Sequence, residues 1–223
     1  SKCGWSGDTG EDSWKPGSIL AHIEKSLRLL NTDRLDLIQL HSCSEAILRN
    51  GEVITAVQTA RDRGYTRYIG YSGDGESAKF AIGTGVFDTL QTSINVADQE
   101  VLRENLPMAR ERNMGVIAKR PIANAAWKNG KKPENSYHHE YWERLQKLQY
   151  DFLKNKLDDA VSTALRFTLS QPGVHTAIVG TKQPGRWKQN AALLEAGPLT
   201  QQEIDAIRTR WSAIADSSWV GQV

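Results

Sequence analysis

Short apolar runs and longer amphipathic segments follow one another along the whole chain. The short runs are rich in β-branched and aliphatic residues and end at glycine or polar residues, a pattern typical of buried strands. They predict five full strands, and the first residues predict the end of a sixth. These segments are 1–4, 35–40, 66–73, 87–95, 114–124 with a turn at its end, and 174–181.

Helical spacing fills the segments between these strands. Apolar residues at Ile19, Ile23 and Leu27 recur every three to four positions and predict a helix that Ser18 could cap. Residues 44–64 predict one long helix ending at Gly64, because glycine commonly stands just past a helix. Further helices are predicted around 76–85, 99–113, 158–171, 185–197 and 200–215.

The alternation of strand and helix predicts an α/β fold. Strands separated by helices pair in parallel, with the crossover helices outside the sheet. No linker divides the chain, so we expect a single domain over residues 1–223. A polar and aromatic insert at about 125–157 interrupts the alternation, and it carries glycine, lysine and proline at 130–133. We expect this insert to be the most mobile region.

Composition and charge exclude several classes of protein. The 223 residues include 28 Lys and Arg against 26 Asp and Glu. This net charge of +2 is too small to indicate a protein that binds nucleic acid. The sequence has no apolar run of about 18 residues for a membrane span, and its start lacks the apolar core of a signal peptide. Two cysteines without a CxxC pair predict neither a disulfide framework nor a metal site, so we expect a reduced, cytoplasmic protein.

Each predicted strand ends on polar residues. In parallel sheets, functional groups lie just past the carboxyl ends of the strands. A purely structural sheet also has polar residues there, because loops begin at the same positions. The candidates are Lys2, His41, Ser72, Gln91, Asn95, Lys119, Arg120, Gly180, Thr181 and Lys182.

Three stretches of the sequence resemble the aldo-keto reductases. They are "SILAHIEKSLRLLNTDRLDLIQLH" at 18–41, "GVIAKRPIAN" at 115–124 and "VHTAIVGTKQPGRWKQN" at 174–190. The resemblance runs from Ser1 to about Asn190 and implies the family's fold, a (β/α)8 barrel of the TIM type. It also implies reduction of a small-molecule carbonyl substrate with NADP(H), which the family binds without a glycine-rich Rossmann loop.

The resemblance assigns two catalytic candidates. His41 falls on the histidine that orients the substrate carbonyl, and Lys2 falls on the lysine that lowers the pKa of a catalytic tyrosine. A nearby ammonium favours the phenolate, which makes the phenol a better acid near neutral pH. The alternatives are that His41 merely ends a strand and that Lys2 is a solvated terminal side chain.

Further residues match the nicotinamide side of the family's cofactor site. Ser72 and Gln91 fall on the groups that hydrogen-bond the carboxamide, and Gly73 stands where an asparagine usually follows the serine. Lys119 stands where many members have a ring-stacking tyrosine, and Arg120 follows it. The resemblance therefore implies a subgroup with a basic end to the family's seventh strand.

The last strand and the following helix match the phosphate side of that site. Thr181 and Arg186 fall on the residues that hold the 2′-phosphate, and a guanidinium can clamp a phosphate with two parallel hydrogen bonds. A Pro-Gly pair before Arg186 predicts a helix N-terminus there, where anions bind favourably. We therefore expect NADP rather than NAD, the alternative being an ordinary surface arginine. The other candidates are Gly180, Lys182, Gln189 and Asn190, of which the last two match the pair that reads adenine.

The start of the chain departs from the family pattern. The family's catalytic tyrosine and aspartate lie on its first two βα units, whereas residue 1 matches the end of the third strand. We therefore expect a partial barrel lacking those units, and an NADP(H)-dependent oxidoreductase that is catalytically incomplete. The alternatives are a non-catalytic NADP(H)-binding regulatory protein and a structural remnant of the same fold. Open sheet edges would favour a homo-oligomer or a separate N-terminal segment.

Other features have simpler interpretations. The adjacent histidines of "YHHEYW", residues 137–142, do not face one metal ion, and we expect a surface or lid element there. We interpret Cys43 as a small buried residue and Tyr71 as pointing away from Ser72, since neighbours on a strand face opposite sides. The insert's aromatic residues either wall an apolar substrate pocket or pack against helices; they are Trp127, Tyr137, Tyr141 and Trp142.

Overall fold

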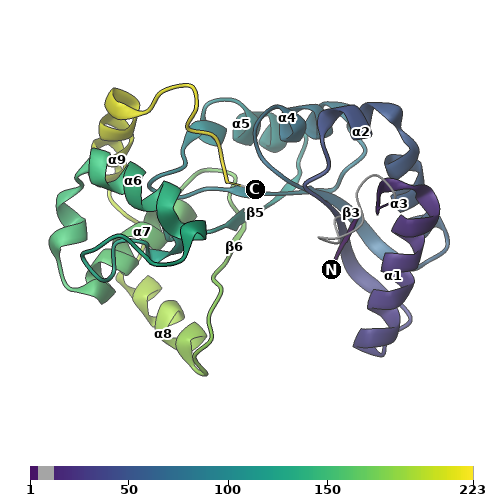
Figure 1. Cartoon of the computed structure of the whole chain (residues 1–223), viewed down its shortest axis with the longest axis horizontal. Coiled ribbons are helices and arrows are strands. Elements are labelled where there is room, and N and C mark those ends of the chain that lie inside the picture. The colour runs from purple at the N-terminus through teal and green to yellow at the C-terminus, as the bar shows by residue number, and fades with distance from the viewer. Residues whose placement is uncertain (5–12, 223) are drawn as a thin grey trace. The chain divides into compact units, whose positions relative to one another are not determined.

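The chain folds into two compact α/β units. The computed structural model describes residues 1–4 and 13–222. The first unit comprises residues 1–92, 104–116 and 222–223, and the second comprises 93–103 and 117–221. Within each unit the paired strands are parallel, as the alternation of strand and helix predicts (Figure 1). The single domain expected over residues 1–223 stays a prediction, as does the partial barrel.

Parallel strands in the order β1-β2-β3-β4 form the sheet of the first unit. They are β1 (Lys2–Gly4), β2 (Leu35–His41), β3 (Thr66–Ser72) and β4 (Thr89–Ser93), whose last residue belongs to the second unit. The helices of this unit are α1 (Pro16–Leu30), α2 (Glu45–Asn50), α3 (Glu52–Asp62), α4 (Gly75–Thr84) and α5 (Asn105–Glu111). Helices α1 and α3 pack side by side (Figure 1).

Helix α1 begins two residues before its predicted cap. Pro16 occupies the start of the helix, where its fixed φ suits the first turn and its missing N–H costs nothing. Ser18 therefore lies inside the helix, and the prediction that it caps α1 is wrong. The predicted apolar spacing is confirmed, because Ile19, Ile23 and Leu27 are all buried.

A glycine divides the long helix predicted over residues 44–64. Gly51 has a φ of 80°, a left-handed conformation that ends α2 and begins α3. The Ser44 hydroxyl caps α2 by accepting a hydrogen bond from the N–H of Ile47 at 3.4 Å. Gly64, with a φ of 77°, follows the last turn of α3 as the sequence predicts. The predicted single helix is thus two helices with a sharp break.

The second unit contains a parallel strand pair and the C-terminal helices. Strand β5 (Gly115–Lys119), which starts in the first unit, pairs with β6 (Thr176–Ile178) so that Lys119 lies opposite Ile178. Strand β6 is shorter than the predicted 174–181 segment, and Thr176 and Ile178 are exposed. The helices are α6 (His139–Leu148), α7 (Leu157–Leu169), α8 (Arg186–Ala192) and α9 (Gln201–Ile214), with 3-10 turns η2 (Glu100–Leu102), η3 (Ala123–Ala125), η4 (Ser136–His138), η5 (Asp151–Lys154) and η6 (Leu193–Ala196).

The insert at 125–157 contains a helix that the sequence pattern did not predict. In α6, Tyr141, Leu145 and Leu148 are buried at helical spacing, and Arg144 is buried among them. An arginine on the buried stripe interrupts the apolar periodicity, which explains why the pattern was missed. The expectation of a surface element at 137–142 is wrong for Tyr141, whose exposed fraction is 0%.

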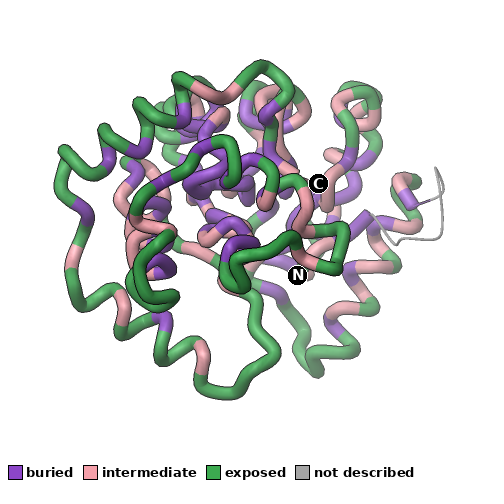
Figure 2. Tube along the Cα trace, turned by 60° about the vertical axis from the view of Figure 1, so that its left-hand side comes forward, coloured by how far each residue is buried: buried purple, intermediate pink, exposed green. Residues whose placement is uncertain are grey.

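Burial follows the strands and the inward stripes of the helices in each unit. Figure 2 shows purple, buried stretches alternating with green, exposed ones along the helices. Of the helices built from residues 1–4 and 13–222, none combines the length and the apolar character that a membrane crossing requires.

Candidate active site

One face of the first unit's sheet is lined with polar side chains near the carboxyl ends of the strands. The strand registers set Gly4, His41, Ser72 and Gln91 in a single row, which we call the polar row. Residues two positions earlier point to the same face, because side chains alternate along a strand. They are Lys2, Gln39, Gly70 and Thr89. The opposite face is buried and mostly apolar, with Cys3, Leu40, Tyr71 and Leu90.

Lys2 and Ser72 meet on the polar face. The Lys2 ammonium donates a hydrogen bond from Nζ to Ser72 Oγ at 3.0 Å. Ser72 is 1% exposed, whereas Lys2 and His41 are half-buried at the edge of this face. Because His41 is the register partner of Ser72, the structure brings Lys2, His41 and Ser72 together in the first unit. Gln91, the next residue in the polar row, is the register partner of Ser72 on β4.

Tyr71 points to the other side of the sheet from Ser72, and Cys43 is buried, as the sequence predicts. The Tyr71 hydroxyl donates a hydrogen bond to the Cys43 carbonyl at 2.7 Å, and both residues are buried. Burial raises the pKa of the Cys43 thiol to about 12, so the reactive thiolate is strongly disfavoured. Burial also raises the pKa of Tyr71 above its ordinary value. Both residues therefore stay protonated at neutral pH.

Arg120, in the second unit, is anchored by a tyrosine from the insert. Its Nε donates to the Tyr137 hydroxyl at 2.8 Å and its Nη1 to Ser93 Oγ at 3.2 Å. Arg120 has a φ of 54°, and residues 123–125 also have positive φ, between 44° and 55°. Such conformations are costly for residues with a Cβ and cluster at functional sites. Lys119, immediately before Arg120, is half-buried at the end of β5.

The predicted phosphate residues lie in one exposed segment of the second unit. The Thr181 hydroxyl accepts from the N–H of Gln183 at 3.0 Å, and Arg186 Nη2 donates to Gln183 Oε1 at 2.6 Å. Helix α8 begins at Arg186 after Gly185, confirming the predicted helix start. Gly180 and Lys182 are exposed beside Thr181. A hydroxyl, an ammonium and a guanidinium form a donor set whose chemistry fits a phosphate group.

Of the two residues predicted to contact the adenine ring, one is exposed and the other is buried. Gln189 is exposed, whereas Asn190 is 8% exposed within α8. Adjacent residues on a helix project about 100° apart, which accounts for this difference. The Gln189 amide is therefore the accessible member of the pair.

Sequence reasoning missed a buried ionic cluster in the second unit. Arg144 and Asp98 form an ion pair with both residues 2% exposed, and the Tyr141 hydroxyl donates to Asp98 Oδ2 at 2.6 Å. Arg144 Nη2 also donates to the Val220 carbonyl at 3.0 Å. Burial first, and then the Asp98 charge, raise the pKa of Tyr141 well above its ordinary value. Of the two alternatives for the insert's aromatics, Tyr141 therefore follows the second, packing into the interior.

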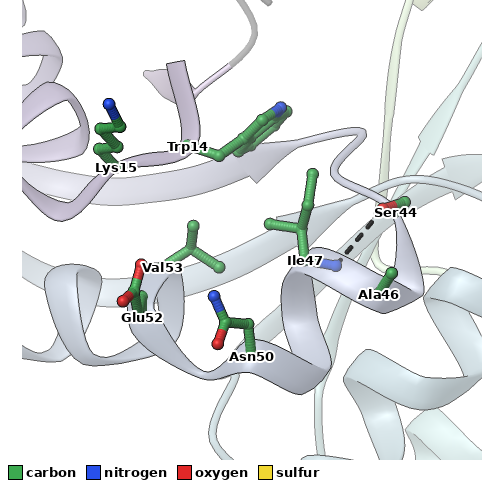
Figure 3. A pocket seen from close by; sticks show the side chains of 8 residues that line it. All are labelled: Trp14, Lys15, Ser44, Ala46, Ile47, Asn50, Glu52 and Val53. Atoms are coloured by element: carbon green, nitrogen blue, oxygen red, sulfur yellow. Dashed lines mark hydrogen bonds between the residues drawn. The ribbon is translucent and has the colours of Figure 1, made fainter. Parts of the chain in front are cut away.

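A cavity of about 580 Å³ opens in the first unit between the start of α1 and helices α2 and α3. It is lined by Trp14, Lys15, Ser44, Ala46, Ile47, Asn50, Glu52 and Val53. Figure 3 shows the Trp14 indole facing Ile47 and Val53 across this space. The indole covers Gly4, since a Cβ at that glycine would come within 2.1 Å of the ring. Half of the lining residues are apolar and half are polar, and the charges of Lys15 and Glu52 have opposite signs.

The chain is similar in sequence and in fold to several known proteins. The model of the Aldo/keto reductase family matches residues 1–211. The "Uncharacterized oxidoreductase YqkF" of Bacillus subtilis (strain 168) is 26% identical over 224 residues, which cover 93% of this chain and 72% of that protein. The "L-galactose dehydrogenase" of Arabidopsis thaliana is 22% identical over 211 residues, which cover 88% of this chain and 65% of that protein.

Solved structures show the same fold. The holo form of aldo-keto reductase AKR11C1 from Bacillus halodurans matches with a TM-score of 0.74 at 24% identity, over 98% of this chain and 73% of that one. The glycerol dehydrogenase AKR11B4 from Gluconobacter oxydans matches with a TM-score of 0.68 at 19% identity, over 96% and 72%. At these identities the likeness shows the fold alone, an α/β fold of the barrel type.

Proposed function

Because this chain belongs to the aldo/keto reductase family, a family of oxidoreductases, we propose that it reduces aldehyde or ketone carbonyls with NADP(H). The observation that carries this proposal is the polar row of the first unit. There Lys2 Nζ lies 3.0 Å from Ser72 Oγ, and His41 is the register partner of that serine. An imidazole and a hydroxyl at the carboxyl ends of parallel strands, with the ammonium of Lys2 on the same face two positions before the row, are suited to binding a polarised carbonyl.

Three residues of the row, together with Lys2 on the same face, have distinct tasks in the proposed reaction. His41 donates a hydrogen bond to the carbonyl oxygen and fixes its orientation. Lys2, held by its hydrogen bond to Ser72, stabilises the negative charge that develops on that oxygen. Ser72 and Gln91 offer hydroxyl and amide groups to the carboxamide of the nicotinamide ring. A bound nicotinamide cofactor would supply the hydride itself.

We expect none of the three buried tyrosines to be the proton donor. The hydroxyls of Tyr71, Tyr141 and Tyr150 each donate to an internal carbonyl or carboxylate. Burial raises the pKa of each, which makes each a weaker acid. We propose that, with these three hydroxyls held internally, the chain binds cofactor and carbonyl but protonates the product slowly.

The exposed segment after β6 supports NADP over NAD. Thr181, Lys182 and Arg186 together offer a hydroxyl and two positive charges to the 2′-phosphate, a group that NAD lacks. Gly180 leaves the backbone accessible beside them, since a Cβ there would meet nothing within 4 Å. The basic residues Lys119 and Arg120 at the end of β5 would add to the attraction for an anionic cofactor.

Two measurements on the purified chain test this function. Titration with NADPH, followed by tryptophan fluorescence, should show saturable binding. Oxidation of NADPH in the presence of nitrobenzaldehyde should be slow, and His41→Asn should abolish it while His175→Asn, a change of an exposed histidine, should not. Absence of NADPH binding would contradict the proposed reductase, and brisk turnover would contradict the proposed slow protonation.

A further inference from the structure

The backbone turn that follows His41 is strained. Ser42, the next residue, has a φ of 59°, in the left-handed region that residues with a Cβ rarely adopt. Such a conformation is energetically costly and persists only where the surroundings hold it in place. What holds this turn therefore acts in addition to the strand pairing with Gly4 and Ser72 that places His41 at the end of β2.

Strand β3 holds the turn through two hydrogen bonds. The N–H of Ser42 donates to the Ser72 carbonyl at 2.7 Å, and the Tyr71 hydroxyl donates to the Cys43 carbonyl at 2.7 Å. The first bond joins two backbone groups, so it does not depend on which side chains stand at these positions. The second requires a tyrosine hydroxyl at this position. Because burial raises the pKa of Tyr71, its proton remains available for this bond at neutral and mildly alkaline pH.

The residue after Ser72 leaves room for the tyrosine. A Cβ at Gly73 would come within 2.6 Å of both Cε1 and the hydroxyl oxygen of Tyr71. Gly73 does not have a left-handed φ, so its backbone does not demand glycine. Its small size is instead required by the ring beside it. Tyr71 and Gly73 therefore act as a pair on either side of Ser72.

We propose that Tyr71 is a positioning residue that fixes the imidazole of His41 by tying the 42–43 turn to β3. Strand alternation turns the Tyr71 ring away from the polar row, so the effect passes through the backbone and not through contact with a substrate. This inference rests on the proposed function for its catalytic meaning. The geometric part, the dependence of His41 on Tyr71, can be measured without turnover.

Tyr71→Phe removes the hydroxyl and keeps the ring, whose centroid lies 6.1 Å from that of Phe87. Tyr150→Phe is the matched control, because its hydroxyl is also buried and donates to the carbonyls of Val96 and Ile207 at 3.0 and 3.2 Å in the second unit. Imidazole ¹H–¹⁵N spectra of the five histidines report each variant, with His41 assigned from His41→Asn. We expect Tyr71→Phe to move the His41 signals and Tyr150→Phe to leave them in place.

A second pair of variants probes the same contact from the other side. Gly73→Ala should displace the Tyr71 ring and move the His41 signals in the same way as Tyr71→Phe. Gly83→Ala is its control, since a Cβ at Gly83 would meet nothing within 4 Å. His41 signals that stay fixed in both Tyr71→Phe and Gly73→Ala, or that respond equally to the two controls, would overturn the positioning role.

Ligand binding separates this inference from the proposed function. With NADP⁺ bound, we expect Tyr71→Phe to weaken binding of nitrobenzaldehyde about five- to tenfold while the dissociation constant of NADP⁺ changes less than twofold. A chain that binds no NADP⁺, but whose His41 signals respond to Tyr71→Phe, would refute the reductase and retain the positioning role. Unchanged aldehyde affinity in a variant with displaced His41 signals would refute the role in the reaction.

Discussion

Arg186 and Lys188 carry the same charge on the same helix and differ in their neighbours. Arg186 shares Gln183 with Thr181 through hydrogen bonds, whereas the Lys188 ammonium lies 5.5 Å from the centroid of the Trp187 ring. If the guanidinium clamps the 2′-phosphate, Arg186→Ala should weaken NADPH binding about 10- to 100-fold, the range for a charge-assisted bond of ~1.5–3 kcal/mol.

Equilibrium titration of both cofactors checks this prediction. The affinity for NADH should change little in Arg186→Ala, because NADH has no 2′-phosphate. Lys188→Ala removes an equal charge and should preserve the preference for NADPH. A similar loss for both cofactors, or for both variants, would indicate a general electrostatic effect instead of a phosphate clamp.

The two buried thiols predict a loss of stability at alkaline pH. Burial raises the pKa of Cys3 and of Cys43 from 9.0 to about 12. The unfolded chain therefore releases these protons above pH 9 while the folded chain keeps them up to about pH 12. The stabilisation is complete below pH 9 and should be lost as pH rises through this window, at about 1.4 kcal/mol per pH unit for each thiol.

Urea unfolding at pH 8, 9 and 10 measures this slope. Cys43→Ala should reduce the slope between pH 9 and 10, whatever its effect on stability at pH 8, and the remaining slope comes from Cys3 and the three buried tyrosines, whose pKa values are also raised. A free energy of unfolding that stays constant from pH 8 to 10 would show that the thiols titrate alike in both states.

Among the secondary-structure elements, the break between α2 and α3 depends on a single glycine. Gly51 has a φ of 80°, whereas Gly17 lies within α1 with open space around it. Gly51→Ala should lower the free energy of unfolding by roughly 1–2 kcal/mol, the cost of a left-handed conformation. Gly17→Ala should raise it by roughly 0.5 kcal/mol, since alanine loses less backbone freedom in a helix. Chemical denaturation should show that the two variants change the free energy of unfolding in opposite directions.

Most elements could be predicted because their pattern is local. The spacing of Ile19, Ile23 and Leu27 marks α1 without reference to any other part of the chain. Helix α6 could not be predicted in this way, because the charge on its buried face is compensated by Asp98, a partner 46 positions away. The break at Gly51 was missed since an isolated glycine is also tolerated within helices.

Within the second unit, the ion pair of Arg144 and Asp98 joins α6 to the loop after β4, and Arg144 also holds the Val220 carbonyl. Arg144→Leu would leave the Asp98 carboxylate buried without its cation. We expect this to lower the free energy of unfolding by about 3–5 kcal/mol. Lys154→Ala, which breaks the exposed pair with Asp151, should change it by less than about 1 kcal/mol. If urea denaturation gave the same change in the free energy of unfolding for both variants, the larger contribution expected of the buried pair would be wrong.

At the level of the whole molecule, the sequence indicated which residues end the strands but not how they meet. The parallel pairing of the strands follows from their alternation with helices, which predicts the polar residues Lys2, His41, Ser72 and Gln91 at one edge of a sheet. The hydrogen bond between Lys2 and Ser72 depends on strand register, and register depends on packing that a local pattern does not record.

The polar row draws its members from positions 4, 41, 72 and 91, each on a different strand. Such contacts between distant parts of a chain are slow to form, because loop closure must precede any gain from pairing. No short peptide excised from this protein would reproduce the row. During refolding, the environment of His41 should become native only when all four strands have docked, which makes this imidazole a late kinetic reporter for the first unit.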